Sequence, residues 1–339
     1  LAVALLASPL ACDESSDEDP IVEDPMALLA NPLDPFPATM TEVGLFPDGN
    51  RLDRISALAA EYTPRWPLWS NGSGKPRHIV IPEGQAVTNP AGGDPWSWEY
   101  PVGTLLFKTF LFVTPASAPE EVPVETRILR RAEDGWEYGL YVWNEAGTEA
   151  TLGDLKLPLM VEVLAEDGTV FEHGVPNKLQ CRKCHESAPD VVLGLGELQL
   201  AWAVDGEVSQ LEALHERGFL AHAAPATPTA ITHADPATVE VLGYLHGNCA
   251  HCHNGSDGPS SSFDLHWDVA LDNLINHPTE SSASASGIRV VPGSPEESIL
   301  FLAFSGETDD PEVKPMPPVG IQLQDAAAIE MLRTWIEGL

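Results

Sequence analysis

The chain has 339 residues, and 43% of them are hydrophobic, so it is long enough for about two domains with a sizeable core. It carries 17 Lys and Arg against 51 Asp and Glu, a formal net charge of −34. So acidic a surface argues against binding to nucleic acid or to anionic membrane faces. We therefore expect no nucleic-acid partner, and a protein partner would need a basic docking face; plain solvation of the surface is the alternative reading of the charge.

The first twelve residues predict the remnant of an export signal. Residues 1–11 are apolar and end in a small residue, as in the central part of a signal that has lost its basic start. Cys12 then precedes an acidic run, which is typical of a lipidated cysteine at a bacterial lipoprotein cleavage site, although Pro9 replaces the usual Leu. The alternative is an ordinary secretory signal with an incidental cysteine. The apolar run is too short to span a bilayer. We expect a protein of the periplasm or cell surface, held at a membrane only through a lipid anchor.

Residues 13–36 are rich in Asp, Glu and Pro, and they predict an acidic linker. Residues 37–172 then predict a β-rich domain. Apolar residues at i, i+3 and i+6 favour a short helix over residues 52–60. Strands rich in aromatic and β-branched residues are expected at residues 78–81, 104–113, 124–130, 136–143, 159–163 and 170–172. Because turn-forming clusters separate these short strands, we expect a β-sandwich or jelly-roll-like domain.

Residues 173–339 predict a mostly α-helical region with long loops. Asn177 is suited to cap a short helix, and apolar residues at helical spacing favour helices at residues 207–217, 236–247 and 325–339. The fold class expected is therefore α+β and multidomain, with a β-sandwich or jelly-roll-like domain before a mostly helical region.

Two short motifs in this helical region have the pattern C-x-x-C-H, the signature of c-type haem attachment. In that chemistry two thiols add across the vinyl groups of one haem, and the adjacent imidazole binds the iron. The pattern predicts two covalently bound haem c groups. Their thioethers would come from Cys181, Cys184, Cys249 and Cys252, and their proximal iron ligands would be His185 and His253.

Two other uses of C-x-x-C pairs compete with this interpretation. A zinc ribbon usually separates its two pairs by about 15–20 residues. Here residues 185–248 separate them, which is a much longer segment. Redox-active or structural cysteine pairs do not need a following histidine.

The iron of an electron-transfer haem usually has a second axial ligand, Met or His. Met316 lies among Pro315, Pro317 and Pro318, and a loop stiffened by prolines is suited to hold a distal thioether for the second haem. The alternative is a methionine that packs under a loop. The distal ligand of the first haem is not identified by spacing; the candidates are His173, His215, His222, His233 and His246, with Met160 and His78 further away. A five-coordinate first iron would instead bind peroxide or a small gas.

With these motifs, the chain resembles a family of exported bacterial dihaem c-type cytochromes that have a β-rich N-terminal half. The matching segments are PLWSNG at residues 67–72, WEYPVGT at 98–104, KTF at 108–110, ETR at 125–127, YVWN at 141–144, VPNKLQC at 175–181, NCAHCH at 248–253, VPGSPEES at 291–298 and MPP at 316–318. The resemblance implies haem-based electron transfer outside the cytoplasm, and it supplies no substrate.

Three functions are compatible with these observations. The first is single-electron transfer to a redox partner protein. The second is a haem enzyme, either dihaem peroxidase-like or a dehydrogenase cytochrome subunit, which would need an open iron beside an acid or base. The third is a surface glycan-binding protein with an attached cytochrome, in which Trp66, Trp69, Trp96 and Trp98 would stack on sugars. We expect an electron carrier more than a stand-alone catalyst.

Overall fold

The computed structural model describes residues 34–90, 97–153, 156, 158–188, 190–206, 208–256, 263–279 and 287–339. The predicted export signal with its lipidated Cys12, the acidic linker up to residue 33, and Trp96 lie outside the described residues.

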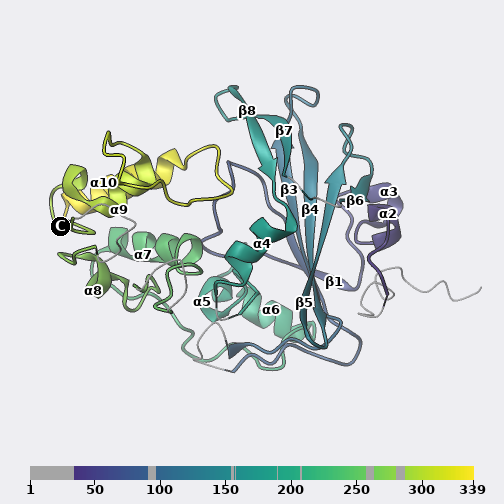
Figure 1. Ribbon diagram of the computed structural model, residues 1–339. Helices are drawn as coiled ribbons and strands as arrows, with labels where there is room; N and C mark the ends of the chain where they lie inside the picture. Colours follow the sequence, from purple (N-terminus) through teal and green to yellow (C-terminus); the bar gives the residue numbers. More distant parts are fainter. Residues whose placement is uncertain are drawn as a thin grey trace, which may run out of the picture.

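A six-stranded antiparallel sheet forms the centre of the β-rich part (Figure 1), and its strands follow one another in chain order. They are β1 (Ala59–Tyr62), β2 (Arg77–Val80), β3 (Leu105–Val113), β4 (Glu121–Ala132), β5 (Gly135–Trp143) and β6 (Ala150–Leu152). A separate hairpin follows, made of β7 (Leu159–Leu164) and β8 (Val170–Val175). All six strands expected from the sequence are confirmed, with ends shifted by a few residues.

The two faces of the sheet are covered by different segments. On one face, Phe107, Ile128 and Tyr141 pack with the short helix α2 (Met40–Val43) and with Leu45 and Phe46, which lie just before the short helix α3 (Pro47–Asn50). On the other face, Ile79 and Leu106 share a core with α5 (Glu197–Leu200) and α6 (Gln210–Glu216). Further along this second face, Phe110 and Phe112 pack against the β7–β8 hairpin. In Figure 1, helices α4, α5 and α6 lie on the side of the sheet that is nearer to the C-terminal helices.

A second core lies among the C-terminal helices, at the other end of the molecule (Figure 1). The helices of this part are α7 (Pro236–Asn248), α8 (Ala270–Leu274), the 3-10 turn η2 (Pro295–Glu297), α9 (Ile299–Ser305) and α10 (Ala326–Glu337), whereas α4 (Lys178–His185) lies beside the sheet. Leu242 of α7 and Trp335 of α10 meet in this core, and Trp66 from the segment after β1 joins them. Every helix in the described ranges falls short of the length and apolarity that crossing a membrane requires.

The expected fold class is wrong in both of its parts. The strands make one meandering sheet with a hairpin beside it, because helices cover its faces where a sandwich would place a second sheet. The region from residue 173 is not mostly helical. Its longest helices, α7 and α10, have 13 and 12 residues, and much of the remaining backbone is turn and loop. Proline and glycine interrupt this region repeatedly, which keeps its helices short.

Candidate functional site

The first C-x-x-C-H motif lies on α4, as its sequence predicts. The Asn177 side chain accepts from the backbone N–H of Gln180 at 3.0 Å, and the Gln180 side chain accepts from the Asn177 N–H at 3.0 Å. This capping box satisfies two donors at the start of the helix. One helical turn then places Cys181 and Cys184 on the same side of α4.

The structure holds His185 in the state that an iron ligand requires. Its Nδ1 lies 2.6 Å from the Val191 carbonyl oxygen, and its ring packs edge-on against Tyr138 of β5 at 6.0 Å. A metal-bound histidine usually donates its other ring N–H to such a carbonyl. Burial, together with the nearby Lys108 ammonium, lowers the pKa of His185 to about 4, so the imidazole is neutral. These features fit the predicted proximal role.

The second motif follows the end of α7. Cys249 is the C-cap residue of this helix and packs against the C-terminal core, where burial raises its pKa to about 12. The His253 ring packs against Phe263 with the ring centroids 4.6 Å apart and the ring planes tilted by 39°. Burial lowers the pKa of His253 to about 4, so this imidazole is also neutral.

The fold brings the two motifs into contact with each other. The Cys184 thiol lies close enough to Cys252 and to His251 to interact with both. The interaction between the two cysteines lowers the pKa of Cys184 and raises that of Cys252. All four motif cysteines are free thiols. Two haems attached through them would therefore be neighbours.

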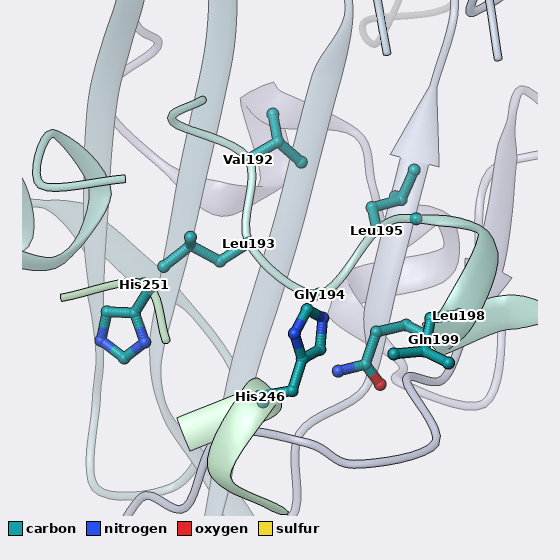
Figure 2. Close-up of a pocket in the computed structure, with 10 residues that line it drawn as sticks. Val192, Leu193, Gly194, Leu195, Leu198, Gln199, His246 and His251 are labelled. Atoms are coloured by element: carbon teal, nitrogen blue, oxygen red, sulfur yellow. The ribbon is translucent and has the colours of Figure 1, made fainter. Parts of the chain in front are cut away.

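A small pocket of about 40 Å³ lies beside this contact (Figure 2). The loop that follows His185 forms one side of it, and His246 and His251 form the other (Figure 2). His246 is 9% exposed, and its Nδ1 is buried with no hydrogen-bond partner among the described residues. A buried polar atom without a partner is costly, so this nitrogen is available to a ligand. The Nδ1 of His78 is also buried without a partner among the described residues, but His78 lies on the face of the sheet away from α4. The sequence did not indicate a role for His251, because it occupies one of the two variable positions between the cysteines of the second C-x-x-C-H motif.

Most other candidates for the first distal ligand are placed elsewhere. The two ring nitrogens of His173 lie 2.9 Å from Glu125 Oε1 and 3.0 Å from Asn71 Nδ2. His78 packs against Phe46, on the sheet face opposite α4. His215 Nδ1 lies 3.0 Å from the Leu220 carbonyl. The remaining candidates, His222, His233 and Met160, are exposed.

Met316 lies in the loop between α9 and α10, where its backbone N–H donates to the Ala303 carbonyl at 2.8 Å. Its side chain is 39% exposed, so it does not fill a gap in the core. Met331, in contrast, packs against the C-terminal core, as its helical position suggests. Met316 stays a predicted distal ligand.

A buried polar network joins the sheet to the C-terminal loop near the first motif. Arg127 donates to both Glu125 oxygens, at 2.6 and 2.8 Å, and His173 contacts the same carboxylate. Asn71 lies on the other side of His173 and donates to Gln322 Oε1 at 2.7 Å. Burial acts to raise the pKa of Glu125, but the Arg127 charge and these hydrogen bonds outweigh burial and lower it.

The tryptophans proposed as sugar platforms have structural roles where they are described. Trp66 and Trp98 are buried, at 7% and 4% exposure. Trp69 donates its Nε1–H to the Leu323 carbonyl at 2.8 Å. These contacts do not favour the glycan-binding interpretation.

Within the described residues, no group of three or more His, Cys, Asp and Glu side chains is arranged to hold a metal ion. This concerns metal sites built from protein ligands alone, since a haem brings its own four nitrogens to the iron. Comparisons with protein-family models, with curated proteins and with solved structures find no match for this chain.

Proposed function

We propose that this chain is an exported dihaem c-type cytochrome that transfers single electrons between two covalently bound haem c groups and a redox partner protein. The observation that carries the proposal is the contact between Cys184 and Cys252, which joins two C-x-x-C-H motifs that are far apart in sequence. An electron passes between two redox groups only when they lie close together. Attachment cysteines that are neighbours in the fold would place the two haems at such a short distance.

Each part of the site has a role in this proposal. Cys181 and Cys184 would hold the first haem, and Cys249 and Cys252 the second. Haem supplies a one-electron couple at its iron when it is bound. Neutral imidazoles from His185 and His253 are the form that binds iron. The net charge of −34 favours a partner with a basic docking face.

The sixth ligands are part of the same proposal. We assign His246 to the first haem, because its buried Nδ1 has no partner among the described residues and its side chain lines the pocket beside Cys184 and His251. We assign Met316 to the second. With both irons six-coordinate, the chain is a carrier, whereas an open first iron would favour the peroxidase-like alternative.

The assignment of His246 is tested by carbon monoxide binding to the reduced protein. The wild type should not bind the gas at the first iron, while His246→Ala should bind it and show the corresponding shift of one Soret band. His215→Ala is the matched control, because this histidine is already hydrogen-bonded to a backbone carbonyl. Unchanged spectra in His246→Ala would refute the assignment.

The experiment that tests the function as a whole is a haem count on protein exported by a bacterial host with a haem-attachment system. A pyridine haemochrome assay should give two haem c per chain. Cys181→Ala with Cys184→Ala should leave one, and Cys249→Ala with Cys252→Ala should also leave one. A wild-type count below two, or zinc in place of iron, would overturn the proposal.

A further inference from the structure

Asn71, in the segment that joins β1 to β2, binds the loop that carries Met316. We call residues 306–325, between α9 and α10, the Met316 loop. The Asn71 Oδ1 accepts from the backbone N–H groups of Gln322 and Leu323, at 2.8 and 3.0 Å. Its Nδ2 donates to Gln322 Oε1 at 2.7 Å and lies 3.0 Å from Nδ1 of His173. A side-chain amide has two acceptor sites and two donors, so Asn71 uses its full capacity.

The partners of this amide fix its orientation. The backbone N–H groups of Gln322 and Leu323 can only donate, so the atom that faces them is the amide oxygen. The NH₂ group then donates to Nδ1 of His173, whose proton is on Nε2 and points to Glu125. Asn71 is 2% exposed. A buried polar group with all of its hydrogen bonds made holds the groups that it binds in one arrangement.

The backbone at Asn71 favours the same residue. Its φ is 58°, in the left-handed region, and Gly72 follows with a φ of 76°. Gly and Asn are the residues that adopt this region most readily, and Gly has no side chain. Asn71 therefore both turns the chain and supplies the amide.

Trp69, two residues earlier, contacts the same loop and the end of α7. Its Nε1–H donates to the Leu323 carbonyl at 2.8 Å, and its backbone N–H donates to Asn248 Oδ1 at 2.6 Å. Asn248 is the last residue of α7 and directly precedes Cys249. Residues 69–71 therefore connect the Met316 loop to the helix that leads into the second C-x-x-C-H motif.

The Met316 loop is fixed on both sides of Met316. The Met316 backbone N–H donates to the Ala303 carbonyl of α9 at 2.8 Å, and Asn71 holds the chain at Gln322. The short stretch between Met316 and Gln322 begins with Pro317 and Pro318, whose rings restrict φ. A displacement of Gln322 would therefore be carried to Met316.

We propose that Asn71 is a positioning residue, which holds the Met316 thioether in place for the iron of the second haem. This rests on the proposed function, in which Met316 is the distal ligand of that iron. A loop that is already held in its bound conformation binds more tightly, because less conformational freedom is lost on binding. A methionine ligand raises the potential of a haem. The β-rich half then contributes to the redox properties of the second haem through Asn71.

The test is a pH titration of the oxidised, haem-loaded chain, followed through its near-infrared methionine-to-iron band. As the pH rises, hydroxide or a neutral lysine competes with the thioether, so the midpoint of band loss reports how firmly Met316 is held. Asn71→Gly keeps the left-handed backbone without strain and removes only the amide. We expect the ligation equilibrium to weaken about tenfold, the effect of about one or two hydrogen bonds. This lowers the midpoint by about one pH unit if one proton is released.

Asn89→Gly is the matched control, because Asn89 is also a buried asparagine that binds a distant segment. Its amide accepts from the His222 backbone N–H at 2.9 Å and donates to the His222 carbonyl at 3.0 Å. The midpoint of this variant should match that of the wild type. If Asn71→Gly fails to fold, Trp69→Phe removes only the indole bond to Leu323 and should also lower the midpoint.

Each outcome decides the proposal. A lower midpoint in Asn71→Gly, with two haems bound and with Asn89→Gly like the wild type, supports the positioning role. An unchanged midpoint, or an equal fall in Asn89→Gly, overturns it, because general destabilisation would then explain any change. A wild type that carries two haems but lacks the band overturns the role of Asn71 and leaves the electron-transfer function in place. A wild type with fewer than two haems overturns the proposed function itself.

Discussion

Replacing Glu125 with Gln should destabilise the protein by about 3 kcal/mol at pH 7. Glu125 is fully buried and accepts three hydrogen bonds, two from Arg127 and one from His173. A bond to a charged group contributes roughly 1 kcal/mol more than a neutral one. Gln also has only one oxygen, so its NH₂ must face a donor and leave it unsatisfied. The total agrees with the about 3–5 kcal/mol lost when a buried ion pair is broken.

The loss should depend on pH with a definite sign. The folded-state pKa of Glu125 lies below its ordinary value of 4.5, so the carboxylate's contribution is complete above that value and is lost as the pH falls through the folded-state pKa. Urea unfolding of the haem-loaded chain, followed by circular dichroism, measures the difference at pH 7 and at lower pH. Glu307→Gln is the control, because its pair with Arg333 is exposed and should contribute at most about 1 kcal/mol. A loss no larger than this control, or one that grows in acid, would refute the reasoning.

Three further predictions concern α7, a buried lysine and the second haem. A Cβ at Gly243 would lie 2.0 Å from Cε2 of Trp66, so Gly243→Ala should cost roughly 1–3 kcal/mol despite its better helix propensity, and an unchanged melting temperature would contradict this. Burial, with neighbouring cations, lowers the pKa of Lys75 to about 7. The folded state then binds fewer protons than the unfolded state from pH 7 up to the ordinary value of 10.5, so wild type should gain stability over Lys75→Met between pH 7 and 9 in urea titrations; a constant difference would argue against it. Met316→Ala should remove the methionine-to-iron charge-transfer band of one haem in the near-infrared, and an intact band would rule Met316 out.

The strands of the sheet were predictable because their signals are local. Alternating aromatic and β-branched residues between turn clusters define β3, β4 and β5, and the capping residues of α4 are likewise visible in sequence. The predictions that were wrong depend on contacts between segments that are distant in sequence. The apolar spacing of residues 52–60 favours a helix, but this stretch forms turns that lead into β1, whose residues are held by pairing with β2. Local propensity cannot report that pairing.

The number of layers and the contact between the motifs were not predictable for a related reason. A β-sandwich and a single sheet covered by helices give the same sequence pattern of apolar residues along their strands. In both, the strands bury apolar side chains, and the pattern does not show whether a second sheet or a helix covers them. The difference lies in the helices that cover the two faces: α2 precedes the strands in sequence, and α5 and α6 follow them. The meeting of Cys184 and Cys252 likewise depends on how these segments pack.

The segment after β1 determines whether the C-terminal half of the chain can fold without the β-rich half. Trp66 fills the C-terminal core, the Trp69 backbone N–H donates to Asn248 Oδ1 at 2.6 Å, and the Trp69 indole reaches the loop before α10. Residues 173–339 alone would lack these contacts at the end of α7, directly before the second motif. We therefore expect residues 173–339 not to fold as an independent unit, because a segment from the β-rich half completes their core.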